Sequence, residues 1–118
     1  MAQNVNLDLR KSQKQYMILT LGDGNKIEIC KPSKAIFNLI KPLAQSFNDL
    51  NGADLSETDS WDLLDTIYEL CSKIMSHNRE RKEISVEYLE NTLDTEDLQL
   101  FFESYMAFVT NQLENAKN

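Results

Sequence analysis

The side chains that could perform covalent or acid–base chemistry are few in this sequence. Cys30 and Cys71 are the only cysteines, and His77 is the only histidine. A Cys–His pair can produce a thiolate nucleophile, but Cys71 and His77 stand six positions apart, an offset that does not align two side chains on one helix face. With so few sulfur and imidazole ligands, a structural zinc site is also not expected. These residues predict neither a nucleophilic enzyme nor a zinc protein.

Two further segments contain residues typical of ligand sites. Gly22-Asp23-Gly24 looks like part of a phosphate loop, but it leads into a strand-like run, so a hairpin turn is the better interpretation. Asp54, Glu57 and Asp59 suggest a calcium loop, but the EF-hand spacing and its closing glutamate are missing. No GxSxG, Walker, GxGxxG or HExxH motif occurs. We therefore expect a non-catalytic protein with no cofactor and no metal, whose function is binding.

Composition is that of one folded, acidic domain. Of the 118 residues, 42% are hydrophobic and 26% are charged. Residues 1–41 carry seven Lys/Arg against three Asp/Glu, whereas residues 42–118 carry five against sixteen. Phosphate repels such an acidic part, so nucleic-acid binding is not expected. No apolar run is long enough for a membrane span, and the first 15 residues lack the core of a signal peptide. We expect a cytoplasmic protein with two buried thiols, a disulfide being the alternative.

The one strand-like pattern lies near the N-terminus. Two runs rich in β-branched or aliphatic residues, 16–21 and 26–30, flank Gly22-Asp23-Gly24-Asn25, whose dipeptides favour the positive φ of hairpin turns. Apolar and charged residues alternate in the second run, which predicts one buried and one wet face. Two strands alone are marginal in water, so the hairpin must lie on helices or pair with another strand. Its open edges are a possible site for strand addition by a partner.

The next two segments have helical periodicity. Ser33 is the expected cap of a first helix, in which Pro42 predicts a kink or two short helices. A second helix starts at Ser56 or Asp59, with acidic residues in its first turn. Its broad apolar stripe begins at Trp61. The polar stretch HNRERKE that follows predicts a solvated loop.

Two capped helices complete the chain. Ser85 is the expected cap of a short helix. Asp94 is the expected cap of the last helix, with Asp97 at the third helical position, as in a capping box. The patterns together predict an α+β fold, mainly α, with an N-terminal β-hairpin packed on a bundle of three to four helices. Residues 1–15 are expected to be a flexible arm, 16–113 a single domain and 114–118 a polar C-terminal tail.

The last helix carries more apolar surface than a core-facing stripe requires. Its large apolar residues cover an arc of roughly 160° at 100° per residue, whereas an ordinary stripe spans little more than 100°. These residues are Leu98, Phe101, Phe102, Tyr105, Met106, Phe108, Val109 and Leu113. Leu100 lies outside the arc. Either the helix packs centrally and touches neighbours on both sides, or part of its surface binds a partner's helix or a second copy.

The second alternative gives a specific hypothesis about the last helix. The middle of the stripe is expected in the core: Phe102, Tyr105 and Val109. Leu100, Phe101 and Phe108, at or beyond the edges of the stripe, are expected to contact a partner, because an edge is shielded only where a neighbouring element reaches it.

Two stretches are similar to a known family. ISVEYLENTLDTEDLQLFFESYMAFV resembles the segment in which tail assembly chaperones of long-tailed, siphovirus-like phages and prophages carry a short capped helix, an acidic helix start and a final apolar helix. YMILTLGDGNKIEICKPSKAIFNLIKPL is similar to the opening of that family, a hairpin leading into a helix, although Pro42 departs from it. The resemblance covers residues 16 to 110.

The resemblance implies a small non-catalytic protein of phage morphogenesis. Such a protein binds the tape-measure protein in the host cytoplasm, helps to recruit tail-tube subunits around it, and is not in the mature virion. In many phages a frameshift also makes a longer form. The alternative function is a small protein-interaction adaptor or regulator encoded by a mobile element. Self-association is a further possibility, and neither function involves nucleic acid or a membrane.

Overall fold

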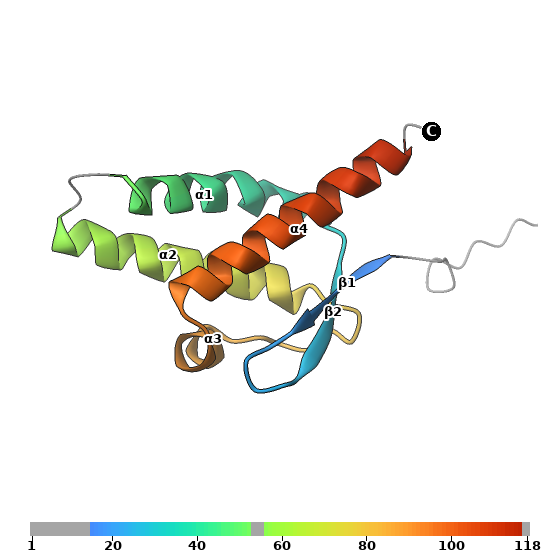
Figure 1. Cartoon of the computed structure of the whole chain (residues 1–118), viewed down its shortest axis with the longest axis horizontal. Helices are drawn as coiled ribbons and strands as arrows, with labels where there is room; N and C mark the ends of the chain where they lie inside the picture. Colours follow the sequence, from blue (N-terminus) through green and yellow to red (C-terminus); the bar gives the residue numbers. More distant parts are fainter. Residues whose placement is uncertain (1–14, 53–55, 117–118) are drawn as a thin grey trace, which may run out of the picture.

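The chain folds as a hairpin followed by four helices. The computed structural model describes residues 15–52 and 56–116, with side chains described as far as residue 110. The elements are β1 (Tyr16–Thr20), β2 (Lys26–Cys30), α1 (Lys34–Leu50), α2 (Glu57–Ser76), α3 (Val86–Thr92) and α4 (Thr95–Ala116). The helices α1 and α2 pack antiparallel, α4 crosses this pair diagonally, and the hairpin lies beside the C-terminal end of α2 (Figure 1). The predicted fold class is confirmed.

The hairpin has the turn and the two faces that its sequence predicts. Gly24 has a φ of 89°, which a residue with a Cβ rarely adopts, and the amide of Leu21 donates to the carbonyl of Asn25 at 2.7 Å. In the antiparallel register Met17 lies opposite Ile29. The side chain of Ile29 is fully buried, whereas Ile18, on the other face, is exposed. One face of the hairpin therefore completes the core.

The outer edge of β2 is covered by the loop after α2. The amide of Cys30 donates to the carbonyl of His77 at 3.0 Å, and the amide of Arg79 donates to the carbonyl of Glu28 at 2.9 Å. Asn78, between them, is buried and anchors the loop. The expectation of a purely solvated loop is therefore wrong at 77–79, and the β2 edge is not open. Within the described residues, β1 has β2 as its only neighbouring strand.

Each helix begins at the cap expected for it. The hydroxyls of Ser33, Ser56 and Ser85 each accept a hydrogen bond from the amide three residues further on. Of the two alternatives for α2, Ser56 is the cap. At α4 the capping box is reciprocal: the amide of Asp97 donates to Asp94 at 2.9 Å, and the amide of Asp94 donates to Asp97 at 3.1 Å.

Pro42 does not divide the first helix. The helix α1 runs as one element from Lys34 to Leu50, so the expectation of two short helices is wrong. Pro42 and Asn38, whose carbonyl loses its helical partner, are both on the exposed side, where water can hydrogen-bond that carbonyl. The buried residues Leu43 and Phe47 meanwhile hold the opposite face against the core.

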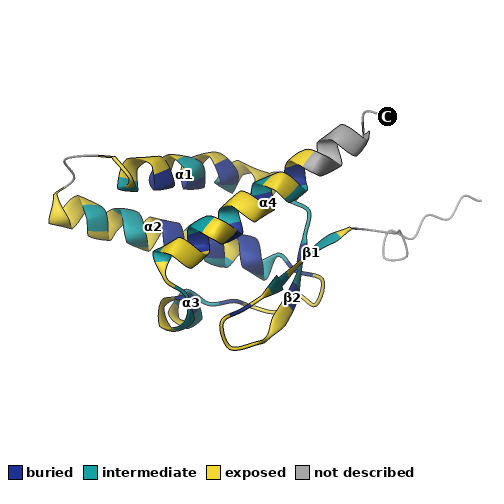
Figure 2. Ribbon diagram, in the orientation of Figure 1, coloured by how far each residue is buried: buried dark blue, intermediate teal, exposed yellow. Residues whose placement is uncertain are grey.

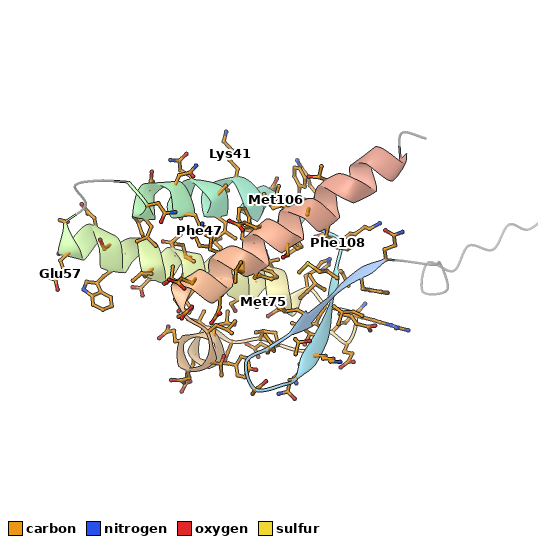
Figure 3. The ribbon with its side chains drawn as sticks, viewed as in Figure 1. Lys41, Phe47, Glu57, Met75, Met106 and Phe108 are labelled. Carbon is orange, nitrogen blue, oxygen red and sulfur yellow. The ribbon has the colours of Figure 1, made fainter. Side chains whose placement is uncertain are left out.

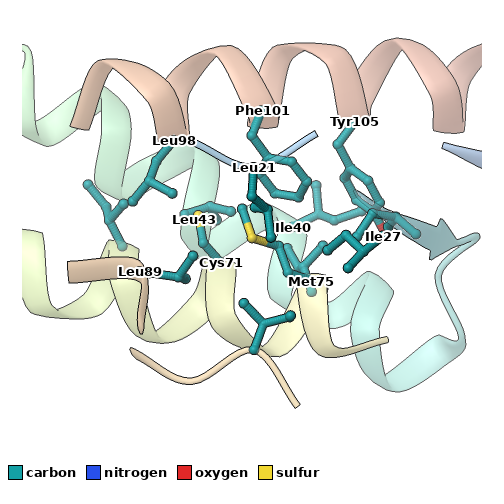
Figure 4. Packing of buried hydrophobic residues seen from close by; sticks show 14 of the residues in the cluster. Leu21, Ile27, Ile40, Leu43, Cys71, Met75, Leu89, Leu98, Phe101 and Tyr105 are labelled. Atoms are coloured by element: carbon teal, nitrogen blue, oxygen red, sulfur yellow. The ribbon is translucent and has the colours of Figure 1, made fainter. Parts of the chain in front are cut away.

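The core lies where α1, α2 and α4 meet and continues under the hairpin and α3 (Figures 2 and 4). Its buried apolar residues are Leu21, Ile27, Ile29, Ile40, Leu43, Phe47, Ile67, Cys71, Ile74, Met75, Ile84, Leu89, Leu98, Phe101, Tyr105 and Val109. A long-range hydrogen bond supports the packing, because the hydroxyl of Tyr68 on α2 donates to the carbonyl of Leu93 at 2.7 Å. All six elements therefore share one core.

The predicted boundaries differ from the structure at the C-terminal end. The helix α4 extends to Ala116, so the tail expected at 114–118 begins inside it. The arm expected at 1–15 lies outside the described residues, apart from Gln15.

Candidate partner-binding surface

The structure separates the three residues of α4 that were expected to contact a partner. Leu100 has an exposed fraction of 63%, in agreement with an accessible position. Phe108 is half-buried and packs against the core. Phe101 is only 3% exposed, so its expected position at an accessible edge is wrong. Of the three, Leu100 is the residue that a partner can reach without a rearrangement.

The correction at Phe101 follows from how α4 is rotated over the core. The buried residues of this helix are Leu98, Phe101, Tyr105 and Val109, which recur at helical spacing. The rings of Phe101 and Tyr105 stack with centroids 5.7 Å apart. In Figure 4, Phe101 and Leu21 point into the same core. The centre of the buried stripe is therefore displaced towards Phe101 and lies closer to the hairpin than the sequence pattern indicates.

Phe102, which was expected in the middle of the stripe, lies towards its α1 side. It is half-buried, and its ring stacks on Phe47 of α1 with centroids 5.5 Å apart. On the other side of α4, the amine of Lys31 lies 5.9 Å from the ring centroid of Phe108. Neighbours on both sides therefore account for most of the 160° arc. The central-helix alternative explains its width.

The chemically active residue types are engaged in structural contacts. The thiol of Cys71 is fully buried, and this burial raises its pKa to about 12, so it is protonated at neutral pH. A ring nitrogen of His77 lies 3.1 Å from the carbonyl of Lys31. Cys71 is therefore not an activated nucleophile. Within the described part of the chain, no group of three or more His, Cys, Asp or Glu side chains is placed to hold a metal ion.

A shallow groove lies between α1 and the C-terminal half of α2. It has a volume of about 580 Å³ and is lined by Ala35, Ile36, Leu39, Ser72, Lys73, Ser76, His77 and Glu83. The hydroxyls of Ser72 and Ser76 already donate to the carbonyl of Ile84. The groove therefore offers an apolar wall with mixed charges at its rim and few polar groups that lack a partner.

One buried polar atom in the core is unsatisfied. The side chain of Tyr105 has no solvent exposure, and within the described residues its hydroxyl has no hydrogen-bond partner. Burial, and secondarily the nearby Cys30 thiol, raise the pKa of Tyr105 to about 12. This hydroxyl weakens the packing of α4 against the core, because its desolvation is not offset.

An exposed hydrogen bond links the hairpin turn to α3. The hydroxyl of Tyr88 donates to a carboxylate oxygen of Asp23 at 2.6 Å. This bond makes the largest contribution to holding the pKa of Asp23 below its ordinary value. The hydrogen bond from the amide of Asn25 makes the second largest. The turn is thereby positioned by a side chain 65 positions along the chain.

Four large apolar side chains face solvent among the described residues. Ile18 on β1 is 66% exposed, Phe37 on α1 49%, Trp61 on α2 61% and Leu100 on α4 63%. Leu100 was identified from its place outside the apolar arc. Trp61 was counted in the apolar stripe of the second helix, and its exposure could not be read from that pattern. It is accessible because the first turns of α2 extend beyond the start of α4 (Figure 1).

The surroundings of Trp61 are acidic. Glu57 and Asp65, four positions on either side, are both exposed. Figure 3 shows Glu57 at the outer end of α2, far from Phe108. Residues 57–72 contain five Asp/Glu and no Lys or Arg. This surface, defined by Glu57, Trp61, Leu64 and Asp65, is called the α2 tip below.

Comparisons with known proteins find no matching family model, no similar curated protein and no similar solved structure. Membership of the tail assembly chaperone family therefore stays a prediction from the sequence resemblance. Among the described residues, no helix combines the length and apolar character that a membrane span requires.

Proposed function

We propose that this protein is a non-catalytic tail assembly chaperone of a long-tailed phage or prophage. In this role it binds the tape-measure protein in the host cytoplasm and helps to recruit tail-tube subunits around it. The proposal joins the sequence resemblance over residues 16 to 110 with large apolar side chains that are exposed and that a partner can contact. Self-association remains compatible with the same surface.

The observation that carries the proposal is the set of exposed large apolar side chains. One such residue is ordinary on a protein surface, and Leu100 alone would need no explanation. Among the residues whose side chains the structure describes, four occur on four different elements, and two of them are aromatic. Aromatic residues are enriched where proteins bind one another. The net charge of −7 would keep such a protein soluble while it covers apolar segments of its partner.

The test is co-expression with the tape-measure protein. If the proposal is right, the gene lies just upstream of a very long reading frame, and the product of that frame is soluble and co-purifies only when this protein is present. Leu100→Ala should weaken co-purification, by about tenfold in affinity for an interface hot spot. Ser104→Ala is the matched control, because it changes another exposed residue one turn away on α4.

A tape-measure protein that aggregates equally with and without this chain would overturn the proposal. A gene located beside a repressor or a toxin would instead favour the alternative, a protein-interaction adaptor or regulator of a mobile element.

A further inference from the structure

The α2 tip combines an exposed indole with exposed carboxylates. Trp61 is 61% exposed, and Leu64, three positions later, is half-buried. Burying a tryptophan removes roughly 150–250 Å² of surface from water, so its exposure gives up a large hydrophobic gain. Tryptophan is also the residue most enriched among interface hot spots, together with tyrosine and arginine. The position is therefore suited to anchor a partner.

The charged side chains next to this indole along α2 are all negative. On a helix, residues four apart have Cβ atoms about 5–6 Å apart, so Glu57 and Asp65 flank the Trp61 ring on both sides. In the described ranges 15–52 and 56–110, no Lys or Arg forms an ion pair with either carboxylate. The nearest basic residue along α2 is Lys73, three turns from Trp61. Among the described residues, no basic side chain neutralises the negative charge of the tip.

We propose that the α2 tip is a docking site for a cationic amphipathic helix of another protein. Trp61 and Leu64 contact its apolar stripe, and Glu57 and Asp65 pair with Arg or Lys side chains that border the stripe. An Arg side chain can also lie on the indole face, where the ring attracts a cation. This inference rests on the proposed function in taking the partner to be a protein, and it specifies the chemistry of the segment that binds.

A helix is the conformation that suits this surface. The backbone amides and carbonyls in the body of α2 are bonded within the helix, so the tip has no open strand edge for main-chain pairing. Recognition there depends on side chains. An amphipathic helix places an apolar stripe and its bordering cations on one side, at the same spacing that Trp61, Leu64 and Asp65 have on α2.

The experiment uses the full chain and a synthetic peptide of about three heptads without tryptophan, with Leu at the a and d positions and Arg beside them. Trp61 is the only tryptophan, so its emission reports on the site alone. We expect the peptide to shift this emission to shorter wavelength and to protect the indole from quenching. We also expect the peptide affinity to fall as salt rises, because exposed charges are screened. In the protein without peptide, and relative to free tryptophan in the same solution, caesium should quench Trp61 more strongly than iodide does.

Two matched pairs of variants locate the contact. Glu57→Gln with Asp65→Asn should weaken binding by about tenfold, whereas Glu87→Gln with Glu90→Gln, an equal charge change on exposed residues of α3, should leave it unchanged. With a fluorescently labelled peptide, Trp61→Ala should lower the affinity by at least about tenfold.

Ile18→Ala is the control for that change, because it truncates a side chain of similar exposure on β1 and should bind the peptide normally. Circular dichroism confirms that each variant is folded.

Three results would overturn the inference. Equal binding of a peptide in which Ser replaces every Leu would mean attraction to net charge only. Equal losses from the two double variants would mean that no site exists at the tip. An emission shift that grows with protein concentration in the absence of peptide would make a second copy of this chain the occupant. Loss of tape-measure binding with peptide binding intact would refute the proposed function alone.

Discussion

Truncating three neighbouring residues of α4 tests the rotation of this helix over the core. Phe101 is 3% exposed, so Phe101→Ala should lower the free energy of unfolding by about 3–5 kcal/mol, the usual range for a buried phenylalanine. Phe102 is half-buried and has one ring partner, so Phe102→Ala should lower it by about 2 kcal/mol. Leu100 is 63% exposed, and Leu100→Ala should change it by no more than about 0.5 kcal/mol.

These changes in the free energy of unfolding are large relative to the total stability of the domain. A domain of this kind is stable by about 5–15 kcal/mol, and each kcal/mol lost lowers Tm by roughly 4 °C at this size. Phe101→Ala should therefore lower Tm by roughly 12–20 °C or prevent folding.

Urea unfolding followed by far-ultraviolet circular dichroism is the suitable assay. Tryptophan emission is a poor probe of unfolding here, because Trp61 is already exposed in the folded state. An unchanged m-value would show that the comparison is of stability alone. If Phe102→Ala proved more destabilising than Phe101→Ala, the stripe would be centred where the sequence pattern puts it, and the reasoning from burial would be refuted.

Three further changes test other contacts. Asp94→Ala removes the capping box with Asp97 and should lower the free energy of unfolding by about 1 kcal/mol, seen as a lower urea midpoint. Tyr88→Phe removes the strongest contact that lowers the pKa of Asp23, so NMR should show this carboxyl titrating at higher pH. In wild type, the stability that comes from the lowered pKa is present above the ordinary pKa of the carboxyl and is lost as pH falls through its pKa in the folded state. Tyr105→Phe removes a buried hydroxyl that has no hydrogen-bond partner among the described residues, and should raise the free energy of unfolding by about 1 kcal/mol. The raised pKa of Tyr105 costs stability only above pH 10, the pKa of tyrosine in the unfolded state, so this variant should also lose less stability than wild type at alkaline pH. An unchanged urea midpoint would contradict the expected gain in the free energy of unfolding.

The local parts of the fold could be predicted from sequence because their causes are local. A side-chain oxygen at Ser33, Ser85 or Asp94 reaches an amide only three residues away, so each cap is determined within one turn. The hairpin turn depends on glycine at a position that needs positive φ. In each case the residues that make the contact are adjacent in the chain, and no tertiary neighbour decides the outcome.

The errors arise where distant elements decide the outcome. The loop at 77–79 pairs with β2 through backbone atoms, so its side chains carry no strand signature. The apolar arc of α4 is wide enough that its centre cannot be found without knowing which elements lie beside it. Trp61 belongs to an apolar stripe, but it lies in the first turns of α2, which extend beyond α3 and the start of α4 (Figure 1). No pattern within α2 records where those helices begin.

The wide stripe of α4 and the proposed binding residues are therefore two separate features. The stripe is filled by a core that reaches both flanks of the helix, through Phe47 of α1 on one side and Lys31 on the other. The exposed apolar residues of α2 and α4 that remain, Trp61 and Leu100, lie off that core, one beyond its end and one on the outward face. Substitutions there remove little buried surface from the fold. The proposed binding at these two positions can therefore be tested by substitution without unfolding the domain, whereas a substitution at Phe101 would also perturb the fold.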